Sequence, residues 1–90
     1  MRILWDEPKR QQNIVKHGLD FSSANDFDWA GSVVFPSRHG ERGGKRFKAV
    51  GRLGDDLVTI VFGTLGREAI SIVSMRRASR AERRLYDEPR

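Results

Sequence analysis

The stretch RFKAVGRLGDDLVTIVFGTLGREAISIVSM, residues 46–75, decides the fold of this 90-residue chain. Residues 46–53, 57–62 and 69–75 are rich in β-branched and aromatic side chains and favour strands. Glycine-containing turns at 54–56 and 63–66 separate them. Because a parallel crossover needs about a dozen residues or more, turns this short predict that the three strands are antiparallel neighbours.

The residues before this meander predict a short strand and a capped helix. Residues 2–5 are mostly apolar and favour the strand. Asp6 is the expected N-cap of a helix that covers 9–16, and Gly18 is its expected left-handed stop.

Between that helix and the meander we expect a second helix, a strand and a loop. Phe21, Ala24 and Phe27 recur at i, i+3 and i+6, which predicts a short helix over 21–27. Residues 32–35 favour a strand that Pro36 stops. Residues 38–44 hold three glycines and no apolar side chain, which predicts a loop.

The C-terminal end carries a capping box. Ser79 is followed three residues later by Glu82, which predicts a helix that runs to about Tyr86 with Ala81 and Leu85 on one face. The order of elements predicts a single α+β domain over 1–90, in which helices pack on one face of an antiparallel sheet.

The composition excludes several classes of protein. The chain has no cysteine, so disulfides, thiolate nucleophiles and cysteine-ligated metals are absent, and a reducing cytoplasm suits it better than secretion. No apolar run approaches the roughly 20 residues that span a bilayer. His17 and His39 are the only histidines and do not form a metal-binding motif, so an enzyme of this sequence is expected to need no metal and no cofactor.

The net charge of +5 is concentrated in two blocks. Residues 38–52 hold six basic side chains and one acidic, and residues 75–90 hold six arginines and three acidic side chains. Arginine binds phosphate oxygens in a planar, bidentate manner, so these blocks favour contact with nucleic acid. A merely solvated basic surface is the alternative.

Three groups of residues are candidates for such contact. Arg46, Lys48 and Arg52 leave the same face of one strand, which favours phosphate binding over a solvated edge strand. Lys16 and His17 close the first helix, either as partners of the helix dipole or as a site for acid–base chemistry. The third group joins the last strand to the last helix: Arg76, Arg77 and Arg80. It forms a phosphate-binding corner, or else Arg76 and Arg77 straddle the strand end and one of them pairs with Glu82.

Several stretches together resemble a known family. Trp5-Asp6-Glu7, Lys9, Asn13 and Lys16-His17-Gly18 followed by Leu19-Asp20-Phe21 are similar to the opening signature of the BrnT-type toxins. Arg46-Phe47, Val50-Gly51-Arg52 and residues 72–80 with Glu82-Arg83 and Tyr86 match its other stretches. The sequence departs from the pattern at Met75, where a small residue is common, and in the glycine-rich loop 38–45.

The resemblance implies a RelE-like fold and a ribonuclease toxin of a bacterial type II toxin–antitoxin pair. It implies a cognate antitoxin with a ribbon-helix-helix domain, and contact with operator DNA only through the complex of the two proteins. It also favours a set of site residues in this chain: Lys16, His17, Arg52, Arg76, Arg77 and Tyr86.

We therefore expect a metal-independent endoribonuclease in which the 2′-OH of RNA attacks the adjacent phosphorus. Arg52, Arg76 and Arg77 would stabilise the developing charge, with His17 transferring a proton and Tyr86 as a further catalytic candidate. The expected RNA-binding residues are Lys16, Arg46, Lys48 and Arg80. Phe47 either stacks on a base or belongs to the core. The alternatives are a non-catalytic nucleic-acid-binding domain and a module that binds only a protein partner.

Overall fold

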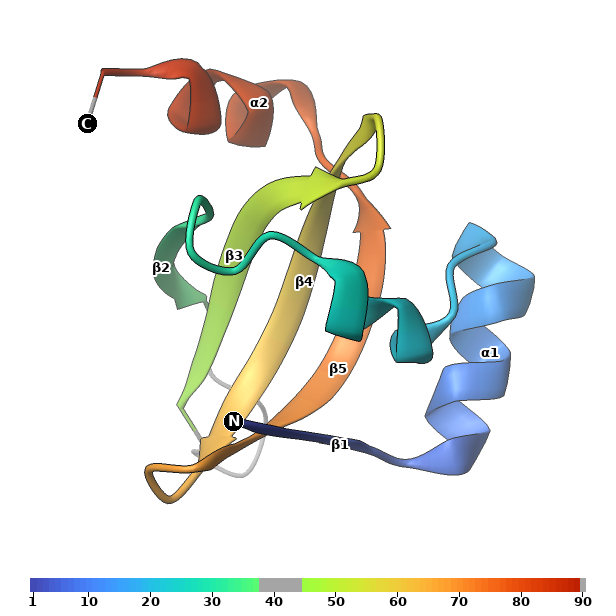
Figure 1. The fold of residues 1–90 in the computed structure, drawn as a ribbon. Helices are drawn as coiled ribbons and strands as arrows, with labels where there is room; N and C mark the ends of the chain where they lie inside the picture. The colour runs from blue at the N-terminus through green and yellow to red at the C-terminus, as the bar shows by residue number, and fades with distance from the viewer. Residues whose placement is uncertain (38–44, 90) are drawn as a thin grey trace.

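The computed structural model describes residues 1–37 and 45–89 and contains one five-stranded sheet in the order β1-β5-β4-β3-β2. Figure 1 shows η1 lying across one face of this sheet and α1 beside its β5 edge. The elements follow the chain as β1 (Arg2–Trp5), α1 (Glu7–His17), η1 (Phe21–Asp26), β2 (Val33–Ser37), β3 (Arg46–Leu53), β4 (Asp56–Leu65), β5 (Ala69–Arg77) and α2 (Arg80–Asp87). The loop predicted over 38–44 lies outside the described residues.

The predicted meander is confirmed, but the sheet is mixed rather than purely antiparallel. Strands β2 to β5 pair antiparallel in chain order, whereas β1 pairs parallel with β5. A parallel pair needs a long connection, and here the chain between Trp5 and Ala69 supplies it. Sequence patterns near residue 2 carry no sign of a partner more than sixty positions away.

Three strands extend beyond their predicted ends. Strand β4 continues through Gly63 to Leu65, so the turn begins later, at Gly66, whose φ of +65° is in the left-handed region. Strand β5 continues to Arg77. Strand β2 runs past Pro36, because β2 is an edge strand and a proline there interrupts no second ladder.

An extra residue in β5 changes which side chains face the core. Phe62 pairs with Ile72 and Val61 pairs with Ser74, so Val73 is bulged out of the ladder. The alternation of core-facing side chains in β5 therefore shifts by one residue after Ile72. As a result, Met75 rather than Ser74 joins the core. Strand β1 pairs with residues 69–72 of β5, and α1 covers the edge of β5 after that. There the buried Asn13 side chain donates to Met75 O at 2.9 Å and accepts from Met75 N at 3.2 Å.

Helix α1 forms where its end signals predict it. Asp6 caps the N-terminus by accepting a hydrogen bond from Lys9 N at 3.3 Å. Gly18 closes the C-terminus with a φ of +70°. The predicted short helix at 21–27 is a 3₁₀ helix, whose three-residue turn suits the i, i+3, i+6 spacing of its apolar side chains.

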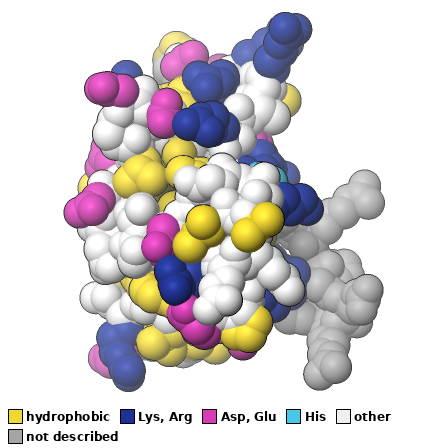
Figure 2. Space-filling model, turned by 90° about the vertical axis from the view of Figure 1, so that its right-hand side faces the viewer, with side chains coloured by type: hydrophobic (Ala, Val, Ile, Leu, Met, Phe, Trp, Pro, Cys, Tyr) yellow, Lys and Arg dark blue, Asp and Glu magenta, His cyan; other side chains and the backbone are white. Residues whose placement is uncertain are grey.

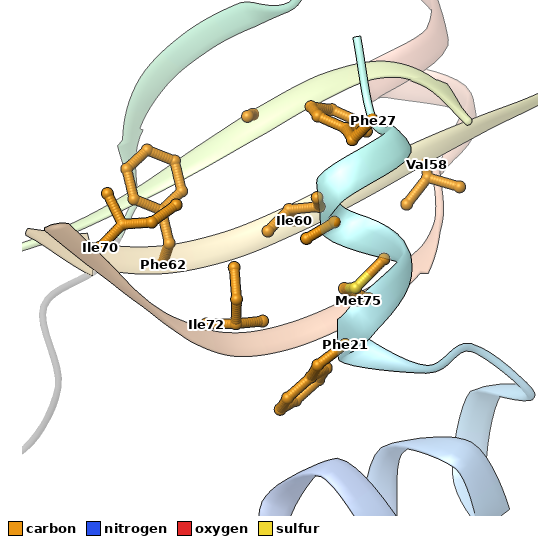
Figure 3. Close-up of a cluster of buried hydrophobic side chains, with 10 residues drawn as sticks. Phe21, Phe27, Val58, Ile60, Phe62, Ile70, Ile72 and Met75 are labelled. Carbon is orange, nitrogen blue, oxygen red and sulfur yellow. The ribbon is translucent and has the colours of Figure 1, made fainter. Parts of the chain in front are cut away.

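The core lies between η1 and the face of the sheet that we call the core face, which carries Ala49, Val58, Ile60, Phe62, Ile70, Ile72 and Met75. Figure 3 shows Phe21 of η1 and Phe27 directed at these strands. Phe47 stacks on Phe62 with ring centroids 5.8 Å apart, so its position is that of a core residue.

The prediction that all helices pack on one face is wrong. Helix α2 lies against the opposite face, where its Glu82 accepts a hydrogen bond from Thr59 at 2.8 Å. Thr59 neighbours Ile60 in β4, so the two side chains leave opposite faces. Along α2, Ala81 and Leu85 are exposed while the charged Glu82 is buried, and an apolar pattern could not predict that arrangement.

Candidate nucleic-acid interface

The face opposite the core carries the cations that the sequence placed together. We call it the basic face and define it by Arg46, Lys48 and Arg52 of β3 and Arg76 of β5. Cross-strand pairing aligns Val50 with Thr59 and Thr59 with Arg76, so Val50 and Arg76 lie on the same side of the sheet. Lys48 is two residues before Val50 in β3 and therefore leaves that side as well. The predicted shared face of Arg46, Lys48 and Arg52 is confirmed by this register.

Glu82 of α2 binds several donors at the upper part of the basic face. Its two carboxylate oxygens accept from Arg76 Nη1 at 2.7 Å and Arg76 Nη2 at 2.8 Å. Lys48 Nζ lies 3.4 Å from Oε2, and Ser79 N donates to Oε1 at 2.8 Å, which completes the predicted capping box. The Arg76 guanidinium holds the pKa of Glu82 well below its usual range. Arg76 is therefore engaged by a carboxylate inside the protein, as the salt-bridge alternative foresaw.

Arg77 does not join this group. It follows Arg76 in β5 and points to the other side of the sheet, where Nη2 lies 3.6 Å from Asp56 Oδ2. Its side chain is 63% exposed. The two neighbouring arginines therefore stand in different environments, and they do not form one anion-binding corner.

Lys16 and His17 line a groove between α1 and β5 that we call the His17 groove. Its walls include Lys9, Gln12, Lys16 and His17 from α1 and Val73 and Ser74 from the bulged part of β5. The groove has a volume of about 230 Å³. It places an imidazole beside a lysine and a serine, next to the basic face.

A second hollow lies on the lower part of the basic face, and we call it the Arg46 depression. Lys9, Lys45, Arg46, Gly63 and Ser71 line it together with Asp6, Thr64, Leu65, Ile72 and Val73, and its volume is about 270 Å³. Because Lys9 and Val73 line both hollows, the depression and the His17 groove are neighbours.

Lys9 and Lys45 are lining residues that the sequence analysis did not select. For Lys9 a signal was present: Lys9, Gln12 and Lys16 are spaced i, i+3 and i+7, which puts them on one helix face. For Lys45 no pattern existed, because it precedes the strand and its position depends on how β3 meets β4.

The remaining predicted residues border these hollows or lie apart from them. Arg52 is exposed near the end of the basic face, beside Leu57 of β4. Arg80 is exposed in the first turn of α2. Tyr86 is half-buried one helical turn after Glu82, so it lies on the same side of α2.

The two faces differ in electrostatic character. The segment 19–32, which includes η1 on the core face, contains Asp20, Asp26 and Asp28 and no Lys or Arg. Figure 2, seen from the α1 side, shows many Lys and Arg side chains towards the top and right and most Asp and Glu side chains towards the left. A polyanion is therefore attracted to the basic face and repelled from the η1 layer.

Residues 1–37 and 45–89 contain no group of three or more His, Asp or Glu side chains arranged to hold a metal ion. No helix among them has the length and apolar character needed to cross a membrane.

Comparison with known proteins gives matches over most of the chain. The family model described as ribonuclease toxin, BrnT, of type II toxin–antitoxin system matches residues 5–82. Among solved structures, the Brucella abortus ribonuclease toxin BrnT is 41% identical, with a TM-score of 0.73. That alignment covers 89% of this chain and 99% of the Brucella chain. No curated protein matches the sequence.

Proposed function

Since the chain belongs to the BrnT family of ribonuclease toxins of type II toxin–antitoxin systems, we propose that it is an endoribonuclease that cleaves RNA in the His17 groove without a metal ion. The observation that carries this proposal is the groove itself. It holds His17, Lys16 and Ser74 at the border of a basic sheet face. A polyanion drawn to that face reaches a side chain that transfers protons near neutral pH.

The chemistry uses a nucleophile that RNA brings itself. The 2′-oxygen forms a bond to the adjacent phosphorus while the bond from phosphorus to the 5′-oxygen breaks. The 2′-OH loses a proton and the leaving 5′-oxygen gains one, and His17 takes part in this transfer. The products are a 2′,3′-cyclic phosphate and a 5′-hydroxyl.

The other site residues have electrostatic roles in this proposal. Lys16, Arg46, Lys48 and Arg80 bind backbone phosphates, and Arg52 and Arg76 stabilise the charge that develops on the phosphoryl oxygens. Tyr86 is a further catalytic candidate because it shares the inner side of α2 with Glu82. Arg77 is also a candidate for stabilising this charge, but only the family resemblance supports it, because its side chain points away from the basic face.

The same proposal covers fold class and partners. We assign the chain as one domain with a RelE-like fold, acting on RNA in the bacterial cytoplasm. Its activity is inhibited by a cognate antitoxin with a ribbon-helix-helix domain, which carries the complex to operator DNA. Membership of a type II toxin–antitoxin family supports the antitoxin partner.

The test is cleavage of end-labelled RNA by the purified protein in EDTA. The wild type is expected to release fragments that end in a cyclic phosphate, and His17→Gln is expected to lose about 10²–10⁴-fold in rate. His17→Lys is the matched control, because a lysine also suits the negative C-terminal end of α1 but has no imidazole for the proton transfer. Activity in His17→Lys would reduce the imidazole to a helix cap. Intact RNA with a gel shift would indicate a non-catalytic binder, and no effect on RNA a module for a protein partner.

A further inference from the structure

Three cations line the Arg46 depression: Lys9, Lys45 and Arg46. Among the described residues, none of Lys9, Lys45 and Arg46 forms an ion pair, whereas Lys48 and Arg76 are both engaged by Glu82. One carboxylate, Asp6, also lines the hollow, and it accepts the capping hydrogen bond from Lys9 N. Three cations against one carboxylate leave a net positive hollow.

The floor of the depression is free of bulk. Gly63 pairs with Arg46 of β3 on one side and with Ser71 of β5 on the other. Across these three strands, a cation and a hydroxyl therefore flank a position that has no side chain. The volume of about 270 Å³ is several times the roughly 30 Å³ that a water molecule occupies in the liquid. Cations and a hydroxyl around an open floor suit a phosphate group, which accepts hydrogen bonds from all of them.

The position of the depression separates it from the His17 groove. Lys9 lines both hollows, and His17 lies eight residues further along α1. At about 1.5 Å per residue, these two positions are about 12 Å apart along the helix axis. Two different phosphates of one RNA strand can therefore lie at the two ends of α1.

We propose that the Arg46 depression binds a backbone phosphate of single-stranded RNA other than the phosphate that lies in the His17 groove. The assignment of the groove as the cleavage site rests on the proposed function above. Lys9, Lys45 and Arg46 hold the phosphate, with Ser71 donating from the floor. The site makes binding depend on the length of the RNA and on salt, and it is indifferent to base sequence.

The experiment measures binding of 2′-O-methylated single-stranded RNA, which cannot be cleaved through the 2′-oxygen. Two lengths are compared, about three and about twelve nucleotides, and the longer one lies within the range of about 4–16 nucleotides known for single-strand sites. Wild-type protein is expected to bind the longer RNA more tightly. Lys45→Gln is expected to reduce that length advantage about tenfold and to lower the magnitude of the salt slope by about 0.7, because Lys45 lines the Arg46 depression and does not line the His17 groove.

Gly63→Val tests the same site without changing any charge. A Cβ at Gly63 meets only Lys45 O, at 3.6 Å, which is an ordinary contact, and valine suits a strand. The added side chain fills the floor, so the length advantage is again expected to fall about tenfold. Arg84→Gln removes an exposed cation from α2, about half a turn away from the sheet-facing Glu82, and is expected to change the ratio less than twofold.

Thermal unfolding of each variant verifies that it folds, and Lys45→Gln, at an exposed position just before β3, stands in if Gly63→Val does not. Equal losses on short and long RNA, or a Gly63→Val protein that binds as the wild type does, would overturn the proposal. Binding with the expected length dependence but no cleavage of unmodified RNA contradicts the proposed function and leaves this phosphate site standing. Cleavage of unmodified RNA together with an unchanged length advantage in both variants supports the proposed function and contradicts this phosphate site.

Discussion

The two faces of one sheet show how this small protein divides its residues between folding and binding. On the core face, Val58, Ile60 and Ile72 are almost completely buried beneath η1. On the basic face, helix α2 covers only the upper part, and the lower part carries Arg46, Gly63 and Ser71 around an open hollow. Adjacent residues of a strand therefore serve different purposes, and substitutions at neighbouring positions should separate stability from RNA binding.

The sharpest form of this comparison uses adjacent residues of β4. Ile60→Ala removes a fully buried side chain and is expected to cost about 2–5 kcal/mol of unfolding free energy through lost burial and a cavity. Val61→Ala, on the half-buried basic face, is expected to cost less than about 1 kcal/mol. Denaturant unfolding measures both values, and equal costs would show that the basic face contributes to the core.

A smaller effect is expected at the two neighbouring arginines of β5. Arg76→Ala removes a bidentate partner of the buried Glu82 and should cost about 2 kcal/mol, since Lys48 and Thr59 continue to bind that carboxylate. Arg77→Ala breaks one exposed pair and should cost less than about 0.5 kcal/mol.

Cleavage rates of the same two variants, corrected for the folded fraction, separate structure from catalysis at these positions. A rate loss in Arg76→Ala beyond the loss of folded protein indicates a direct role in the reaction. If Arg77→Ala loses more activity than Arg76→Ala, the basic face is not where the charge is stabilised.

The smallest effect in this series is the pH dependence that Glu82 contributes. Its pKa is lowered in the folded protein, chiefly by the Arg76 guanidinium, so the carboxylate stabilises the fold above the unfolded-state pKa of about 4.3. That contribution is lost as the pH falls below this value. Glu82→Gln should therefore be less stable than the wild type by about 1–2 kcal/mol at neutral pH, and the gap should narrow in acid. Thermal melts from about pH 7 to about pH 3 measure it, and a constant gap contradicts the assignment.

Much of the fold follows from local signals. Asp6 and Gly18 delimit α1, Ser79 and Glu82 start α2, and the alternation in β3 places Arg46, Lys48 and Arg52 together. Each of these features depends either on a cap at the end of a helix or on residues within about eight positions of one another in the same element. Signals of this kind are visible in the sequence itself.

The features that the sequence did not reveal depend on distant partners. The bulge at Val73 decides that Met75 faces the core and Arg76 the basic face, and no local pattern marks a bulge. The parallel pairing of β1 with β5 joins segments that are far apart in the chain. Glu82 is buried because Arg76 and Thr59 approach it from two strands, so only the assembled sheet shows that Arg76 is already engaged.

The most direct test of the division between the two faces is to locate bound RNA on the surface. Because the chain has no cysteine, a single introduced cysteine can carry a dye at a chosen position. Gln12→Cys in the His17 groove and Asn25→Cys on η1 both replace exposed amides in helical segments, and each can carry an environment-sensitive dye. On titration with single-stranded RNA, the dye at position 12 should change its emission and the dye at position 25 should not. A response at position 25 with none at position 12 would contradict the assignment of RNA to the basic side of the sheet.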